Sequence, residues 1–168
     1  MKKLVKKIAA TIFKYFKDCY LTNNYRKYFE KYKISSDFRF NGENIIFYGS
    51  GNILIGKNSY IGANSTIQAA ERCMVQIGDN CSISHNVRMY TCSNKPDQDF
   101  NLIKSKEKFY GDIVIGNGVW IGANVFINPG IRIDNNVVIG ANSVVTKDIK
   151  ENSIVGGVPA KLIRIKNV

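Results

Sequence analysis

Ile115 to Val145 reads IGNGVWIGANVFINPGIRIDNNVVIGANSVV, and this stretch decides the fold. An aliphatic residue returns at every sixth position, and the residue after each one is small or polar; the aliphatic positions are Ile115, Ile121, Ile127, Ile133, Ile139 and Val145. A helix repeats about every 3.6 residues and a strand alternates every two, so a period of six fits neither. It predicts a solenoid of short strands and turns, with one aliphatic side chain per face pointing inward.

The same period runs upstream of this stretch and is interrupted twice. From Ile45 the composition turns to Ile, Gly, Asn and Ser, and hexads return at Ile55, Ile61 and Ile67 and, after a four-residue slip around Ala70–Met74, at Ile77, Ile83 and Met89. Between Met89 and Ile115 the period is lost, which predicts a loop at about residues 90–112 that leaves the rod. Loops on a rigid scaffold are where function tends to lie.

These boundaries predict three segments. Residues 1–40 form an N-terminal helical segment, residues 41–160 form the solenoid domain with its protruding loop, and residues 161–168 form a short basic tail. The Gly156-Gly-Val-Pro-Ala160 turn is expected to end the rod, because glycine and proline interrupt regular structure.

Charge is concentrated at the N-terminus. The 168 residues carry 24 Lys and Arg against 13 Asp and Glu, a formal net charge of +11. Ten of the basic residues and only two of the acidic ones lie in residues 1–33. Such clustering points to an anionic membrane, nucleic acid or a polyanionic substrate. The repeat region is nearly neutral, so we expect no nucleic-acid partner along the rod.

Residues 1–20 predict an amphipathic helix. At about 100° per residue, one face gathers the apolar side chains and the opposite face gathers lysines. Two interpretations are open: the apolar face lies on an anionic membrane surface, or it packs on the rod or on a neighbouring subunit. Residues 20–40, rich in Tyr and Lys, predict a second short helix and a linker.

The four cysteines show no C-x-x-C spacing, and the chain has a single histidine. We therefore expect no metal site. No signal peptide and no apolar span of membrane-crossing length is visible in the sequence. We expect a cytoplasmic protein, with contact at the inner face of the membrane as the open alternative.

Several motifs resemble those of the hexapeptide-repeat acyltransferases, most closely the maltose and galactoside O-acetyltransferase-like branch. They are Ile77-Gly-Asp-Asn80, the run from Gly111 to Asn124, Ile127-Asn-Pro-Gly130, the run from Val138 to Asp148, and Gly156 to Lys161. The resemblance implies a left-handed parallel β-helix, an exception to the usual right-handed crossover. It also implies a homotrimer with active sites between subunits, acetyl-CoA as the donor, and a sugar hydroxyl as the acceptor.

The resemblance further implies a general base, ordinarily a histidine on the loop that leaves the rod. In this chain Asn94 occupies that position, and an amide cannot act as a general base. The only histidine, His85, lies on the rung that feeds the same loop, and histidine is the side chain best suited to proton transfer near neutral pH. We predict His85 as the catalytic base; the alternative is a surface histidine without a special role.

Other site residues follow from the same resemblance. Asn64 matches an asparagine that orients the acceptor or the base, with a simple turn residue as the alternative, and Asn94 is expected to contact the acceptor. The expected cofactor contacts are small residues at two equivalent corners, two residues at the end of a coil and two C-terminal cations suited to phosphate, namely Ala123, Ala141, Thr146, Lys147, Lys161 and Arg164. Lys161 stands where arginine is expected.

The leading hypothesis is therefore an acetyl-CoA-dependent O-acetyltransferase that acts on a sugar or on a glycan under assembly. One alternative is N-acetylation of an amino sugar or acetylation of a streptogramin-type drug. Another is a catalytically silent trimeric binding protein, for which Asn94 in place of the base is the argument. The sequence leaves open which acceptor is used and whether the acyl group is acetyl.

Overall fold

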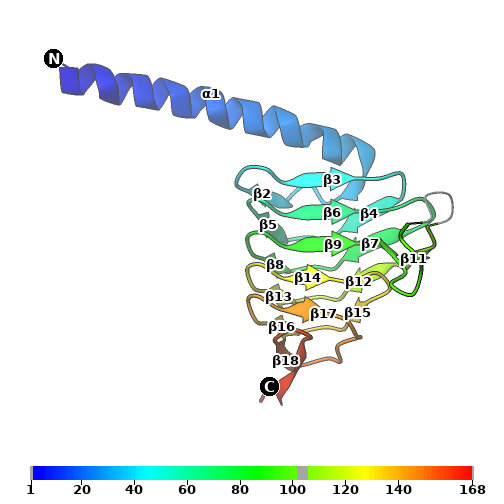
Figure 1. The fold of residues 1–168 in the computed structure, drawn as a ribbon. Helices are drawn as coiled ribbons and strands as arrows, with labels where there is room; N and C mark the ends of the chain where they lie inside the picture. Colours follow the sequence, from blue (N-terminus) through cyan, green and yellow to red (C-terminus); the bar gives the residue numbers. More distant parts are fainter. Residues whose placement is uncertain (1, 102–105, 168) are drawn as a thin grey trace.

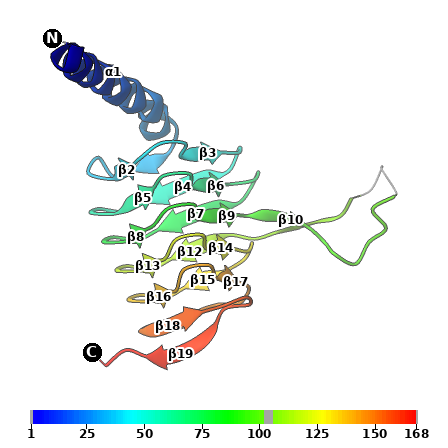
Figure 2. The same ribbon diagram turned by 60° about the vertical axis from the view of Figure 1, so that its left-hand side comes forward.

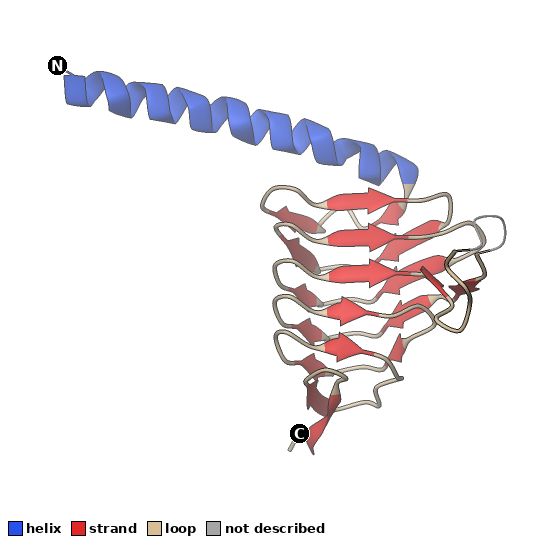
Figure 3. Cartoon of the chain, in the orientation of Figure 1, coloured by secondary structure: helices blue, strands red, loops and turns tan. Residues whose placement is uncertain are grey.

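The chain folds as one long helix followed by a solenoid of short parallel strands. The computed structural model describes residues 2–101 and 106–167. Three sheets form the faces of the solenoid, and α1 (Lys2–Lys31) crosses one end of it (Figures 1 and 3). In Figure 1 the front strands run to the right and each coil drops as it passes behind, which is a left-handed winding. The mainly β solenoid predicted from the hexads is confirmed.

Each complete coil places one strand on each face. In coil order the strands are β1 (Lys33–Ile34), β2 (Arg39–Asn41), β3 (Ile46–Tyr48); β4 (Asn52–Ile55), β5 (Tyr60–Gly62), β6 (Thr66–Gln68); β7 (Met74–Ile77), β8 (Ser82–Ile83), β9 (Arg88–Tyr90); β12 (Ile113–Ile115), β13 (Trp120–Ile121), β14 (Phe126–Ile127); and β15 (Arg132–Ile133), β16 (Val138–Ile139), β17 (Val144–Val145). Sheet A contains β1, β4, β7, β12 and β15, and sheet C contains β3, β6, β9, β14 and β17. Sheet B contains the remaining coil strands and is extended by β18 (Ser153–Gly156) and β19 (Lys161–Ile165).

The core is built from the hexad aliphatics stacked in register. Ile83 on β8 pairs with Ile61 on β5 and Ile121 on β13, and all three side chains are fully buried. Cys81 fills a small inward position and is fully buried. Because every coil repeats the same inward positions, the apolar column is continuous along the rod, and its removal from water stabilises the fold.

Asparagines form the turns between the faces. At the corner between sheets B and C the non-glycine residues with positive φ are Asn44, Asn64, Asn86, Asn124 and Asn142. Asparagine tolerates this left-handed conformation better than other non-glycine residues. The amides also bond along the rod: Asn86 donates to Asn124 at 2.8 Å, and Asn124 donates to Asn142 at 2.9 Å.

The N-terminal helix differs from the prediction of two helices. α1 runs without a break to Lys31, and the first solenoid strand starts at Lys33, so the linker predicted before residue 40 is part of the first coil. Only the last turns of α1 dock: Tyr25 and Tyr28 are buried, and both rings pack on Phe40. The residues that the structure describes contain no helix with the length and apolarity needed to cross a membrane.

The predicted loop is an antiparallel hairpin, and the predicted tail is a strand. β10 (Cys92–Asn94) and β11 (Lys108–Tyr110) pair with each other and project away from the solenoid (Figure 2). Residues 102–105 of the predicted loop lie outside the described residues. At the other end of the chain, β19 turns back and pairs antiparallel with β18, so the basic tail closes the end of sheet B.

Candidate active site

The first part of the candidate site is a column of residues at the corner between sheets B and C. We call it the corner column; it contains Glu43, Ala63, His85, Ala123 and Ala141. Each turn is tied to the next by one backbone bond, for example from the Asn124 amide to the His85 carbonyl at 3.0 Å and from Asn142 to Ala123 at 2.8 Å. The predicted base and both predicted alanine contacts therefore lie on one edge of the rod, in consecutive coils.

His85 is exposed on this column and leans over the coil before it. A Cβ added to Gly62 would lie 2.7 Å from Nδ1 of His85 and 2.8 Å from the His85 amide nitrogen. Gly62 thus leaves the space that the imidazole and the next turn occupy. Within the described part of the chain, neither ring nitrogen has a hydrogen-bond partner, so both are available to a ligand.

Asn64 lies in the turn directly above His85, two residues after Gly62. Its backbone has φ +61°, its amide donates to the Glu43 carbonyl at 2.9 Å, and its side-chain oxygen accepts from Asn44 at 3.1 Å. These contacts give Asn64 a structural role in the turn. The side chain is exposed beside His85, which leaves its NH₂ group free to meet an acceptor.

The second part is a groove beneath the hairpin, at the corner between sheets C and A. This hairpin groove has a volume of about 990 Å³. It brings Asn94 together with Thr146 and Lys147, and its wall includes Phe109 and Pro129. Lys147 is exposed, and among the described residues no carboxylate lies within ion-pairing distance of it. The groove therefore offers an unpaired cation and an amide to a polar or anionic ligand, beside the Asp148 carboxylate, which accepts from the Arg132 amide at 2.8 Å.

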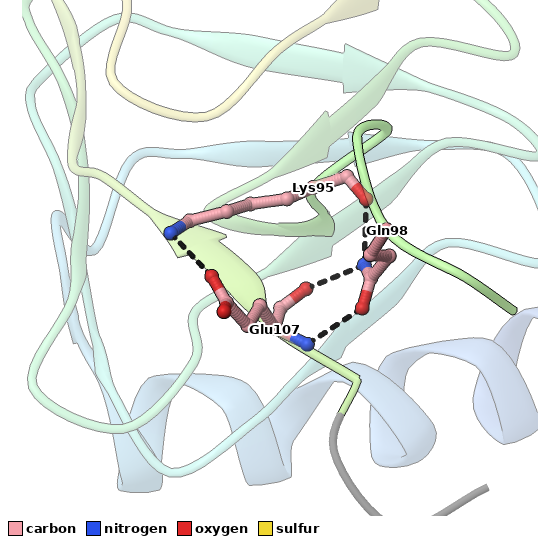
Figure 4. A network of polar contacts seen from close by, with 3 residues as sticks. All are labelled: Lys95, Gln98 and Glu107. Atoms are coloured by element: carbon pink, nitrogen blue, oxygen red, sulfur yellow. Dashed lines mark hydrogen bonds and ion pairs between the residues drawn. The ribbon is translucent and has the colours of Figure 1, made fainter. Parts of the chain in front are cut away.

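A polar network holds the hairpin at its neck (Figure 4). Lys95 Nζ lies 2.7 Å from Glu107 Oε2, and this hydrogen bond and positive charge lower the pKa of the Glu107 carboxyl. Gln98 closes the neck on the other side: its side-chain amide donates to the Glu107 carbonyl at 2.9 Å and accepts from the Glu107 amide at 2.8 Å. The network fixes the direction in which Asn94 enters the groove.

The corner column lies where the strands of sheet C begin, and the hairpin groove lies where they end. β9 joins them: the chain leaves the column at His85, runs through Arg88–Tyr90 and enters the hairpin after Thr91, a path of six residues, or about 20 Å if extended. In Figure 1 the column follows the left-hand edge and the hairpin lies on the right. Sequence adjacency to the loop thus did not bring His85 close to Asn94 within one chain.

The two C-terminal cations are also separated. Lys161 pairs with Gly156 at the start of β19, beside the coil that carries Gly140 and Ala141, so it continues the corner column. Arg164 pairs with Ile154 further along β19 and shares a shallow pocket with Lys166 and Asn167. Lys161 is positioned with Ala123 and Ala141, whereas Arg164 points to a different edge.

Sequence reasoning missed part of the groove wall. Phe109 on β11 covers the Asn128-Pro129-Gly130 turn, and its ring would lie 3.3 Å from a Cβ added to Gly130. An available signal was the aromatic pair Phe109-Tyr110 directly before the hexads resume. Lys95 was missed as well, because its partner Glu107 is twelve residues away and only the hairpin register joins them.

Two known protein families match the repeat regions of this chain. The family described as "Bacterial transferase hexapeptide (six repeats)" matches residues 112–147, and the one described as "Hexapeptide repeat of succinyl-transferase" matches residues 52–88. The two matches cover strands β4 to β8 and β12 to β17, on the two sides of the hairpin.

Named relatives extend this similarity. The chain is 46% identical over 117 residues to the galactoside O-acetyltransferase of Escherichia coli K12, covering 70% of this chain and 55% of that protein. A solved galactoside acetyltransferase in complex with coenzyme A is 44% identical with a TM-score of 0.64, covering 76% of this chain and 65% of that one. The solved maltose O-acetyltransferase of Clostridium difficile 630 is 35% identical with a TM-score of 0.62, covering 77% and 70%.

The chain spans about half the length of the curated relatives that it matches: 55%, 57% and 53% for the first three. The family matches lie in the solenoid, which carries the corner column and one wall of the hairpin groove. The period of six in the sequence, the three-faced coil in the structure and the similarity to these proteins agree. The chain belongs to the hexapeptide-repeat acyltransferases, in the branch of the galactoside and maltose O-acetyltransferases.

Proposed function

We propose that the protein is an acetyl-CoA-dependent O-acetyltransferase that transfers an acetyl group to a hydroxyl of a sugar or glycan. The observation that carries the proposal is the corner column, in which His85 stands in consecutive coils with Ala123 and Ala141. An available imidazole lies beside small side chains on an exposed edge of a rigid rod. The similarity to a galactoside acetyltransferase that binds coenzyme A supports the choice of donor.

The residues present fit coenzyme A, which has a slender pantetheine arm and an anionic phosphate end. Ala123 and Ala141 leave the corner open to a slender arm, and Lys161 adds a cation at the same edge. Thr146 and Lys147 offer a hydroxyl and a second cation in the hairpin groove. Charge-assisted hydrogen bonds from such cations are the usual way in which phosphates are held. Arg164 remains a candidate phosphate contact from a separate edge.

In the proposed reaction, the bound donor supplies an acetyl thioester. His85 accepts the proton of the acceptor hydroxyl as that oxygen attacks the acyl carbon, and the same proton is then available for the departing thiol. Asn64 and Asn94 orient the acceptor by hydrogen bonds. A positioned general base contributes about 10²–10⁴-fold in rate, and holding two substrates in the reacting geometry contributes about 7–11 kcal/mol.

We infer that the working assembly is a homotrimer. The corner column and the hairpin groove lie at opposite ends of sheet C, so one protomer does not hold a complete site by itself. A neighbouring copy that sets its hairpin groove against this column would join His85 to Asn94 and Lys147. Cyclic assembly of this kind repeats the same contact three times and closes.

We also infer a reducing, cytoplasmic setting. The four cysteines are free, and Cys73 and Cys81 are buried in the solenoid. Disulfides are rare in reducing compartments, where buried thiols act as small apolar side chains.

The test of the function is release of free thiol from acetyl-CoA by the full chain offered a panel of sugars and glycans. Wild-type protein is expected to release thiol with at least one hydroxyl acceptor, and His85→Ala to lower kcat by about 10²–10⁴-fold. Asn94→Ala is the matched comparison; we expect it to raise the acceptor KM more than it lowers kcat. Full activity in His85→Ala would remove this residue from the mechanism.

Measuring acetyl-CoA binding alongside thiol release distinguishes an enzyme from a catalytically silent binding protein. A ligand that binds only the folded state raises the Tm, so millimolar acetyl-CoA is expected to stabilise the protein. Stabilisation by acetyl-CoA without thiol release for any acceptor would favour a catalytically silent binding protein. Asn94 at the usual position of the base is the sequence argument for that alternative. Release only with amino sugars or with a streptogramin would favour the alternative acceptors. No stabilisation by acetyl-CoA would count against every transferase assignment.

A further inference from the structure

Residues 2–20 of α1 carry an apolar face that nothing in the described chain covers. Its six large apolar side chains are between 51% and 66% exposed: Leu4, Val5, Ile8, Ile12, Tyr15 and Phe16. Phe13 and Tyr20 are exposed as well, on the side of the helix that carries Lys2 and Lys6. The helix leaves the solenoid end and extends past it into solvent (Figures 1 and 2). At about 1.5 Å per residue, this free part is about 28 Å long.

The docked end of the same helix uses a different face. Leu21, Tyr25, Tyr28 and Phe29 pack against the first coil, and the Tyr25 hydroxyl donates to the Gly42 carbonyl at 2.8 Å. At about 100° per residue, the centre of this docked face lies roughly 130° from the centre of the outer apolar face. Because α1 is continuous, it cannot turn both faces toward the solenoid. The outer face is therefore directed away from its own rod.

Charge decides which partner suits this face. Residues 2–20 contain six lysines and one aspartate, a net charge of +5. Among the residues that the structure describes, they form one ion pair, between Lys17 and Glu43. A second copy of the same helix would bring like charges together, which opposes pairing of two such faces. An anionic lipid surface complements the lysines and receives the apolar side chains together.

We infer that residues 2–20 of α1 lie in the headgroup plane of an anionic membrane and hold the solenoid at its surface. The apolar face enters the boundary of the acyl chains, while the lysine stems extend along the helix and keep their ammonium groups among the phosphates. The docked last turns of the helix, fixed by Tyr25 and Tyr28, transmit this orientation to the rod. The inference concerns placement of the protein and does not depend on the proposed transfer reaction.

Vesicle flotation of the full chain tests it. Wild-type protein is expected to float with vesicles of phosphatidylcholine and phosphatidylglycerol mixed two to one, to float less with phosphatidylcholine alone, and to be released as salt screens the lysines. Ile8→Ser combined with Ile12→Ser and Phe16→Ser should weaken partitioning at least about tenfold, since three exposed apolar anchors are lost. Ala10→Ser, on the lysine side of the same helix, is the matched control and should float as wild type does.

Single-tryptophan reporters test the orientation. With Trp120→Phe as background, Phe16→Trp places the only indole on the outer apolar face, and Ala10→Trp places it on the opposite side. Anionic vesicles should shift the emission of the first reporter to shorter wavelength and leave the second nearly unchanged. Equal shifts, or none, would overturn the proposed orientation.

Two further outcomes would reject the inference. If the triple serine variant floats as wild type does, the apolar face is not the lipid contact. If it instead changes the molar mass of the lipid-free protein, the face is an interface between copies. Thiol release with a soluble acceptor should be unchanged in all these variants, so failure of membrane binding and failure of the proposed function can be told apart.

Discussion

Asn124 combines two tasks in one corner of the rod. Its backbone has φ +60°, and its side chain both accepts from Asn86 and donates to Asn142. Asparagine is suited to such a position because its short amide reaches the neighbouring coils while the backbone tolerates the left-handed region. The same residue type recurs at each equivalent corner, so the ladder is a property of the repeat.

Replacing Asn124 separates the conformational cost from the hydrogen-bond cost. Asn124→Ala loses the ladder bonds and puts a Cβ without a local partner at positive φ, so we expect a loss of about 1–3 kcal/mol in the free energy of unfolding. Asn124→Gly loses the same bonds but keeps the backbone unstrained, and should be about 1 kcal/mol more stable than the alanine variant. Urea denaturation measures both. Equal stabilities would mean that backbone strain contributes nothing here.

At the scale of elements, the junction between α1 and the first coil depends on a buried phenol. Tyr25 is stacked on Phe40 with ring centroids 4.5 Å apart, and burial raises the pKa of its hydroxyl above the usual value. A raised pKa means that the folded state favours the neutral phenol over the phenolate. Its contribution to stability is complete below the unfolded-state pKa of about 10 and is lost as the pH rises through the folded-state pKa.

We therefore expect the docked end of α1 to loosen at alkaline pH before the solenoid unfolds. Amide hydrogen exchange of residues 21–31, followed across neutral and alkaline pH with correction for the intrinsic rate, measures this opening. Tyr25→Phe removes the ionisable group but keeps the ring, so its protection should fall less steeply above pH about 10. Identical profiles for both proteins would show that Tyr25 ionisation does not control the junction.

The hairpin of β10 and β11 is an element added to the rod rather than part of its core. Its described residues between the two strands, 95–101 and 106–107, are mostly exposed, and Lys95, Gln98 and Glu107 close its neck (Figure 4). Replacing residues 95–107 with an Asn-Gly turn keeps β10 and β11 paired and removes this neck. We expect the Tm to change little, because the hexad core is untouched.

The same deletion should weaken acetyl-CoA binding at least about tenfold, since it opens the groove that holds Thr146 and Lys147. Thermal shift with and without acetyl-CoA measures both quantities on one sample. Lys95→Met with Glu107→Leu is the milder comparison, because it removes the ion pair and leaves the chain length unchanged. A large fall in Tm in the absence of ligand would mean that the hairpin supports the fold.

At the scale of the whole molecule, the distance between the corner column and the hairpin groove predicts a shared site. Light scattering should give three times the 18.9 kDa chain mass. Co-expression then tests which chains supply the site. His85→Ala damages the column and Lys147→Glu damages the groove, and each variant alone should have little activity.

Mixed assemblies of these two variants should recover activity. If one copy supplies His85 and its neighbour supplies Lys147, random mixing into trimers leaves about a quarter of the sites with both native residues. If both residues act within one protomer, every site contains one damaged residue and mixing restores nothing. The second result, together with a monomeric mass, would reject the shared site.

The sequence by itself determined the solenoid, the places where its period is interrupted and the family. These depend on local chemistry: a period of six fixes which side chains point inward, and small or asparagine residues fix the turns. It could also place Ala123 and Ala141 at equivalent corners, because their separation is three hexads. The place of His85, on the rung that feeds the loop, followed from the same register.

Only the tertiary structure decided which residues lie close together and which way the N-terminal helix faces. It separated His85 from Asn94, although nine residues join them, because a strand of sheet C spans the width of a face between the two corners. It paired Lys95 with Glu107 through the hairpin register. It also turned the outer face of α1 away from the rod, because docking of Tyr25 and Tyr28 fixed the rotation of a continuous helix. Proximity across coils and the orientation of a helix arise from packing, which a period in the sequence does not encode.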